Sequence, residues 1–213
     1  MDTLSPPRSL VDQAYERILD AVCDGTFRPG ERLTQEEIAA RLNVSRQPIT
    51  HALAMLKTQG FLTEAGRRGL MVAPFDEALL NAIYQFRSAV EPLAVRLATV
   101  RIGAKAAARG RALVEHGAAM VAAGDHRAVL AADVEFHAFI YELSGNPVIA
   151  DAMQLNWRHL RRGMAEVLSH PGFSAAVWRE HAAILEAMIA GDAELAARLM
   201  HDHMAGATTR AGV

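Results

Sequence analysis

Residues 34–61 read TQEEIAARLNVSRQPITHALAMLKTQGF and decide the fold of the N-terminal third of the chain. Apolar residues at positions 38, 39 and 42 recur at helical spacing, a break follows at 43–45, and the spacing resumes at 49, 53 and 56. Thr34 is a typical N-cap residue, and Ser45 is predicted to cap a second helix whose first turn holds Pro48. The stretch therefore predicts two short helices joined by a tight bend, a helix-turn-helix.

The second of these helices carries residue types that can donate to base edges and phosphates in a DNA major groove. They lie on the side of the helix away from its apolar residues. The alternative is an amphipathic helix pair that packs into some other bundle. On the DNA-binding interpretation, including a basic turn described below, the expected contacts are Arg41, Ser45, Arg46, Gln47, Thr50, His51, Arg67 and Arg68.

The charge of the chain is close to neutral, so DNA binding has to depend on local charge. The formal net charge of the 213 residues is -2, whereas residues 41–68 hold five basic side chains and a single acid, Glu64. A hydrophobic content of 51% and a charged content of 22% are ordinary for a globular protein. The single Cys23 cannot form an internal disulfide, and neither a signal-like leader nor an apolar run of membrane-spanning length is found. A cytoplasmic protein without membrane contact is expected.

The segments around the helix-turn-helix predict a complete small domain over residues 10–74, preceded by a flexible arm at 1–9. Residues 10–23 have helical periodicity, and 27–33 contain a Pro-Gly turn that suits a small strand or an extended connector. Two strand-like pieces at 61–64 and 69–73 flank the turn at 65–68, which predicts a β-hairpin with a basic tip. Such a wing can lay Arg67 and Arg68 on the DNA backbone or in the minor groove, and the alternative is a solvated basic turn.

Here the sequence resembles the GntR family of winged-helix transcriptional regulators. The resemblance is carried by FRPGERL at 27–33, AARLNVSRQPI at 39–49 and GRRG at 66–69. It implies a winged helix that binds operator DNA. Members usually carry Arg-Glu after the Pro-Val pair, and the Arg is among their DNA contacts. This chain has Thr50 and His51 there while it retains Arg46, so the operator preference of the family is not carried over.

The remainder of the chain, 75–213, is predicted to be a second, all-helical domain. Pro74 marks the boundary, and no strand signal follows it. Short connections between the helices imply an antiparallel bundle, so the fold class is mainly α. The six expected helices cover 79–100, 106–123, 129–143, 148–168, 174–190 and 193–207.

One acid and three histidines of this half have spacings that allow a shared metal site. Asp133 and His137 are four residues apart and project from one helix face. His181 lies ten residues before Gly191, and His203 eleven residues after Asp192, so in an antiparallel hairpin both lie roughly 15 Å from the turn. One carboxylate and three imidazoles suit Zn, Ni, Mn or Fe and leave coordination positions open. The alternative for each histidine is a surface position or a satisfied core position.

The second half also resembles the FCD domain of the FadR subfamily of GntR regulators, through EPLA at 91–94, DVEFH at 133–137, SGNP at 144–147 and AGD at 190–192. The resemblance implies that Asp133, His137, His181 and His203 bind a divalent cation. It also implies a small carboxylate effector held with the help of an arginine, here Arg87, whose alternative is an ordinary ion pair with Glu91. Arg158 and Arg162, with Arg161 beside them, are further candidates to line the effector cavity.

These expectations combine into a homodimeric, ligand-responsive regulator, most simply a repressor, whose dimer binds two half-sites of a palindromic operator. Two rival functions remain open at this stage. One is an all-helical metal-dependent enzyme, and the other is a regulator in which the metal is purely structural.

Overall fold

The computed structural model describes residues 9–66, 69–167 and 173–211. The chain divides into two compact units, Met1–Phe75 and Asp76–Val213. Arg67, Arg68 and all but the last residue of the predicted N-terminal arm lie outside the described residues. None of the helices in the described ranges has both the length and the apolar character needed to cross a membrane.

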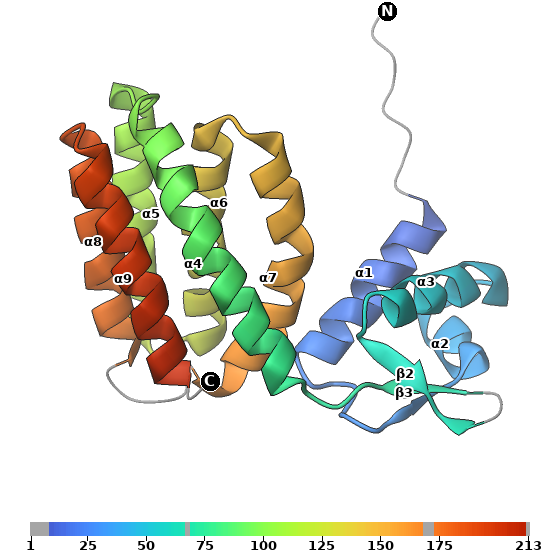
Figure 1. Cartoon of the computed structure of the whole chain (residues 1–213). Helices are drawn as coiled ribbons and strands as arrows, with labels where there is room; N and C mark the ends of the chain where they lie inside the picture. The colour runs from blue at the N-terminus through green and yellow to red at the C-terminus, as the bar shows by residue number, and fades with distance from the viewer. Residues whose placement is uncertain (1–8, 67–68, 168–172, 212–213) are drawn as a thin grey trace, which may run out of the picture. The chain divides into compact units, whose positions relative to one another are not determined.

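The first unit is a winged helix. Its elements are α1 (Leu10–Cys23), β1 (Arg32–Leu33), α2 (Gln35–Leu42), α3 (Arg46–Thr58), β2 (Leu62–Glu64) and β3 (Leu70–Val72), as Figure 1 shows. The strands form an antiparallel sheet in the order β1-β3-β2, in which Met71 pairs with Arg32 on one side and Thr63 on the other. A small strand or an extended connector was expected over residues 27–33. The structure has the small strand, β1, which adds a third strand to the predicted hairpin.

The core of this unit is built from the apolar positions that predicted its helices. α1 packs on α3. The fully buried side chains include Leu19, Ile49, Leu56, Phe61 and Val72, which join both helices to the sheet. Because one side of α3 is used for this packing, its opposite side is left at the surface.

The two helix starts in the helix-turn-helix differ. Thr34 caps α2 as predicted, since its hydroxyl accepts from the Glu37 amide at 3.2 Å and donates to the Glu37 carboxylate at 2.8 Å. The predicted side-chain cap at Ser45 is wrong: Ser45 occupies the N-cap position of α3 but makes no capping hydrogen bond. The third residue of α3 is Pro48, which has no N–H for the hydroxyl to accept. The hydroxyl of Ser45 is therefore not used by its own helix.

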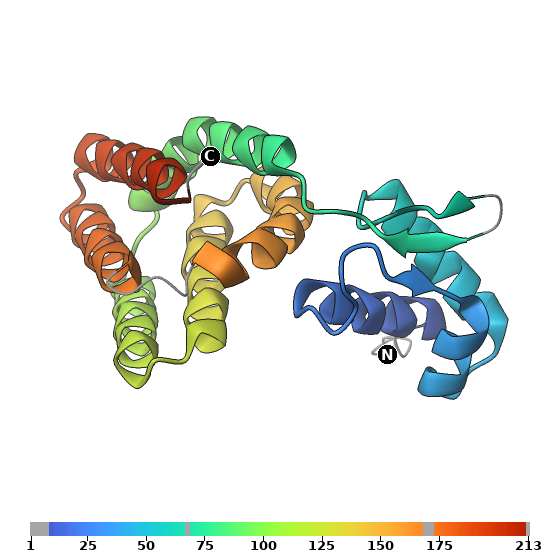
Figure 2. The ribbon, with the colours of Figure 1, turned by 90° about the horizontal axis from the view of Figure 1, so that it is seen from below.

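The second unit contains the six expected helices. They are α4 (Glu77–Thr99), α5 (Ala104–Ala123), α6 (His126–Ser144), α7 (Pro147–Val167), α8 (Phe173–Ile189) and α9 (Ala193–Ala211). Seen from below, they form a ring in the order α4, α9, α8, α5, α6 and α7 (Figure 2), and α6 also contacts α4. Asp76 and Asp125 cap α4 and α6, and Gly124 and Gly145 end α5 and α6 in the left-handed conformation.

Candidate metal centre and DNA-binding face

The apolar core of the helical unit encloses a group of polar side chains. Leu160, Ile184 and Met204 are among the fully buried residues of this core. Burying polar groups costs free energy unless they are paired or bind a ligand. The described core nevertheless buries, with at most 5% of each residue exposed, Arg87, Glu91, Asp133, His137, His181 and His203.

Four of these six residues point toward one another from three helices. Asp133 and His137 come from α6, His181 from α8 and His203 from α9. One ring nitrogen from each histidine lies within 4.8 Å of the others. Nε2 of His181 is 3.2 Å from Nε2 of His203, and Oδ1 of Asp133 is 3.5 Å from Nε2 of His181 and 4.0 Å from Nε2 of His137. The three imidazoles thus share one small volume inside the bundle, and the Asp133 carboxylate lies beside two of them.

Two further carboxylates hold the outer nitrogens of the histidines. Nδ1 of His203 is 2.6 Å from Oε2 of Glu180, and Nδ1 of His137 is 2.5 Å from Oε2 of Glu91. The second contact is close, but its two atoms do not have the alignment of a regular hydrogen bond. A carboxylate at Nδ1 favours the proton there and leaves the Nε2 lone pair directed inward, which is the arrangement seen around metal-bound histidines.

Burial also favours the neutral form of the His203 ring. It lowers the pKa of His203, an effect that the Glu180 contact only partly opposes. Neutral imidazole is the form that binds metals. When the His203 ring is neutral, Glu180 at Nδ1 favours the tautomer with its proton on Nδ1, so the lone pair on Nε2 faces Nε2 of His181. A cation held by His181, His203 and Asp133 would satisfy these donor atoms. The residues present therefore fit a divalent metal.

Aromatic side chains fix the orientation of the histidine rings. Phe136 stacks on His181, with 4.3 Å between ring centroids, and Trp178 meets the same ring edge-on at 4.8 Å. Trp157 lies 5.3 Å from the ring of His137. Trp178 packs against α5 at Gly117, where even a Cβ atom would overlap the indole. The glycine therefore makes room for a ring that positions His181.

A buried ion pair lies beside the four donors. Arg87 donates from Nε to Glu91 at 2.5 Å, and Tyr141 donates to the same carboxylate oxygen at 2.8 Å. Burial alone raises the pKa of Glu91, but the interactions with Arg87 and His137 together outweigh burial and hold that pKa well below its usual range. Nη2 of Arg87 lies 3.3 Å from Nε2 of His137, so the guanidinium reaches the centre itself.

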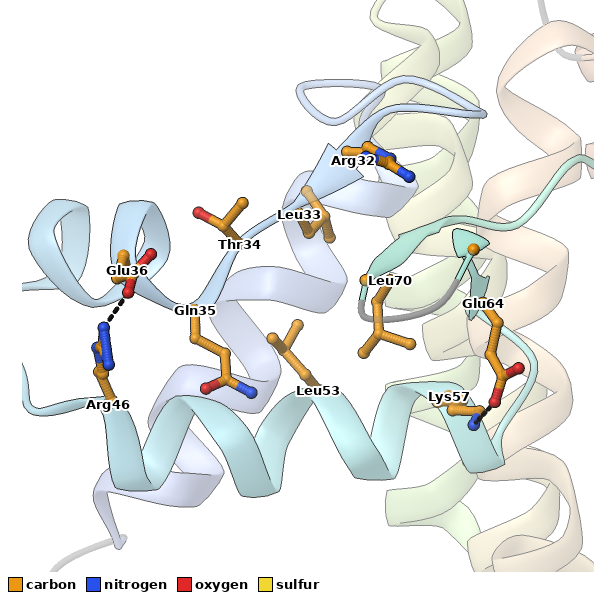
Figure 3. Close-up of a pocket in the computed structure, with 12 residues that line it drawn as sticks. Arg32, Leu33, Thr34, Gln35, Glu36, Arg46, Leu53, Lys57, Glu64 and Leu70 are labelled. Atoms are coloured by element: carbon orange, nitrogen blue, oxygen red, sulfur yellow. Dashed lines mark hydrogen bonds and ion pairs between the residues drawn. The ribbon is translucent and has the colours of Figure 1, made fainter.

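The predicted DNA contacts in the described part of the first unit all lie at the surface. Arg41, Ser45, Arg46, Gln47, Thr50 and His51 are exposed. Thr50 donates its hydroxyl proton to the backbone oxygen of Arg46 at 3.0 Å. Arg46 pairs with Glu36 of α2, and this pair stands at one end of a groove of about 620 Å³ between α3 and the sheet (Figure 3).

Comparisons with known proteins assign the two units. Residues 10–72 match the family described as "Bacterial regulatory proteins, gntR family", and residues 82–206 match the FCD domain. The second match alone covers more than half of the chain. The chain belongs to the GntR family, with an FCD domain.

The relatives of this GntR-family protein are transcription regulators. It is 38% identical to the Nta operon transcriptional regulator of Aminobacter aminovorans over 56% of this chain and 57% of that protein. The match to the probable D-xylose utilization operon transcriptional repressor of Paenarthrobacter nicotinovorans is 27% identical and covers 92% and 86% of the two chains. The chain thus spans little more than half, or less, of the first curated relatives that it matches. Its structure resembles E. coli McbR/YncC with a TM-score of 0.82 at 22% identity, over 95% and 97% of the chains.

The structure of this GntR-family protein brings Asp133, His137, His181 and His203 together and sets Arg87 beside them. Arg87 is paired with Glu91, which is the alternative that its spacing allowed. Arg158, Arg161 and Arg162 are half-buried on α7, the helix that carries Trp157. The sequence interpretation missed Glu180, Tyr141, Trp157 and Trp178. Only Glu180 gave a signal, since it directly precedes His181.

Proposed function

We propose that this protein is a homodimeric transcriptional repressor of the FadR subfamily. Its α3 helices read two half-sites of an operator in the cytoplasm, and its FCD domain binds a divalent metal and a small organic carboxylate. The observation that carries the proposal is the convergence of three imidazoles inside an apolar core, with the Asp133 carboxylate beside two of them. Two of the rings also contact carboxylates at Nδ1.

Asp133, His137, His181 and His203 would hold the metal. A bound Zn, Ni or Mn ion supplies a Lewis acid with coordination positions left for a carboxylate oxygen. Glu91 and Glu180 orient two of the rings, and Phe136 and Trp178 keep water away from a third. The burial of every donor makes a water-exposed catalytic centre a poor description, and the matched families contain regulators, so the enzyme alternative has no support from these observations.

The charge around the centre favours an anionic effector. Arg87 is buried and lies 3.3 Å from a ring nitrogen of His137, and the negative charge of Glu91 balances the single positive charge of Arg87. A bound dication would add two positive charges, of which Asp133 would balance one. Two cations at such short range repel each other strongly in a low-dielectric interior. A carboxylate relieves this repulsion because it can accept from the guanidinium and bind the metal. Arg158 and Arg162 are the second choice as effector contacts.

Homodimerisation is supported by an exposed apolar stripe on α4. Apolar side chains recur every seven residues along one side of the helix and are exposed by 38–45% at Leu79, Phe86 and Leu93, and Val100 at the C-cap continues the row with 77% exposure. Exposed apolar residues in one contiguous row mark an interaction surface. A second copy supplies an identical stripe, and a two-fold axis lets the two stripes pack on each other. The same helix carries Arg87 and Glu91, so an effector that shifts α4 can change how two protomers meet.

The proposal is tested by metal analysis combined with DNA binding. Protein purified without chelator is expected to hold one divalent ion per protomer. A panel of small carboxylic acids is then expected to contain members that raise the melting temperature and weaken operator binding only when the metal is present. If the acids act equally on metal-free protein, the metal and the carboxylate do not share a site. If no acid of the panel has an effect, a purely structural metal is favoured.

A further inference from the structure

The first arginine of the recognition helix is paired with an acid of the preceding helix. Arg46 begins α3, and its Nη2 donates to Oε1 of Glu36, the second residue of α2 (Figure 3). Both side chains are largely exposed, by 60% and 68%. The cap of α2 is formed by Thr34 and Glu37, not by Glu36. Its carboxylate therefore stands at the surface expected to face DNA.

The same groove holds a second pair of this kind. Lys57 near the end of α3 donates to Glu64 of β2 at 2.6 Å, and Gln35, Leu53 and Leu70 lie between the two pairs (Figure 3). DNA affinity comes largely from cations that neutralise phosphates, and a carboxylate next to such a cation weakens that term. Glu36 and Glu64 each lower binding to DNA of any sequence, so at least one needs a compensating contact if the protein is to bind its operator tightly.

The chemistry of a carboxylate selects the contact that Glu36 can make. An ionised carboxylate only accepts hydrogen bonds. In the major groove, guanine offers the acceptors O6 and N7, whereas cytosine offers the N4 amino group as a donor, and glutamate accepts from that group. Arg46 and Glu36 present a donor fork and an acceptor side by side, a pattern that matches the edge of G·C pairs. Thr50, one turn along α3, has no charge to compete with them.

We propose that Glu36 is a specificity-determining residue that accepts a hydrogen bond from N4 of a cytosine in each half-site, while Arg46 donates to a guanine. The inference rests on the proposed reading of an operator by α3. It makes the acid of α2 part of the reading surface. A wrong base at the position that Glu36 reads is costly, because the carboxylate then still repels the DNA phosphates but has lost its hydrogen bond to the base.

The test is selection of binding sites from a randomised duplex library by the full-length protein, with sequencing of the retained DNA. The wild-type protein is expected to retain cytosine at one position of each half-site, with about 5- to 100-fold discrimination against other bases. Glu36→Gln is expected to shift that preference to adenine, since glutamine pairs with N6 and N7 of adenine. Glu36→Ala is expected to lose the preference without gaining another.

Glu64→Gln is the matched control, because it removes the same charge from a paired acid of the same groove. It is expected to raise affinity for all duplexes and to keep the cytosine preference. Unchanged preference in both Glu36 variants would overturn the inference. The inference would also be overturned if the Glu36 variants lost only the guanine preference that the Arg46→Ala variant loses. Glu36 would then act only by positioning Arg46. If the wild-type protein retains no motif at all, operator reading itself fails, and the inference fails with it.

Discussion

Replacement of His181 by alanine separates metal binding from ordinary packing. The His181 ring is fully buried between Phe136 and Trp178 and faces Asp133 and His203. Truncation leaves a cavity, which costs about 2–5 kcal/mol of unfolding free energy with or without metal. Loss of a ligand has a different signature, because it removes only the stabilisation that bound metal provides.

The size of that stabilisation follows from binding linkage. Metal present at about a thousand times its dissociation constant adds about 4 kcal/mol to the free energy of unfolding. For a protein of this size, that corresponds to an increase of about 8–16 °C in melting temperature. Wild-type protein is expected to lose this increment in melting temperature when a chelator is added. The His181→Ala variant is expected to have a lower melting temperature that the chelator does not change.

The assay is a thermal melt with and without chelator, together with metal content by mass spectrometry. His201→Ala is the control, because His201 lies on the same helix as His203 but is exposed. It should behave like wild type. If the His181→Ala variant still holds one metal per protomer and keeps the chelator-sensitive increment, the assignment of His181 as a ligand is refuted.

Two more substitutions test the surroundings of the centre and the dimer. Leu93→Glu in the α4 stripe is expected to turn the dimer into a monomer in light-scattering measurements. Leu195→Glu, at a similarly exposed leucine of α9, is the control and is expected to leave the dimer intact. If both variants are dimers, α4 does not form the interface. Gly117→Ala forces Trp178 away from His181, so it should lower the free energy of unfolding by about 1–3 kcal/mol and weaken metal affinity. Gly110→Ala, whose new Cβ meets the flexible end of Leu185, should leave metal affinity unchanged. Equal metal affinity in the two variants would show that Trp178 does not support the metal centre.

Much of the fold could be predicted because apolar spacing reports directly on helices. All six helices of the second unit follow such periodicity, and the near-symmetry of His181 and His203 about the Gly191 turn brings the rings to one level. Asp133 and His137 share a face because they are one turn apart. The convergence of the donors was therefore readable from the sequence, although metal binding itself stays a prediction.

The parts that escaped prediction depend on contacts between separate helices or on local competition. Glu36 and Arg46 are ten residues apart and meet only because of the angle at the helix-turn-helix bend. Glu180 and His203 pair across two helices, so only the register of α8 and α9 reveals the contact. The missing cap at Ser45 has a cause in the sequence, Pro48, that the preference of serine for N-cap positions concealed.

The central claim is that four side chains of the helical bundle share one metal ion beside Arg87. Anomalous X-ray diffraction from crystals of protein purified without chelator tests it most directly. We predict an anomalous peak about 2.0–2.2 Å from one nitrogen of His137, His181 and His203 and from a carboxylate oxygen of Asp133. A crystal grown with ample Zn, Ni or Mn that shows no peak at this position, or a peak bound by other residues, would contradict the account.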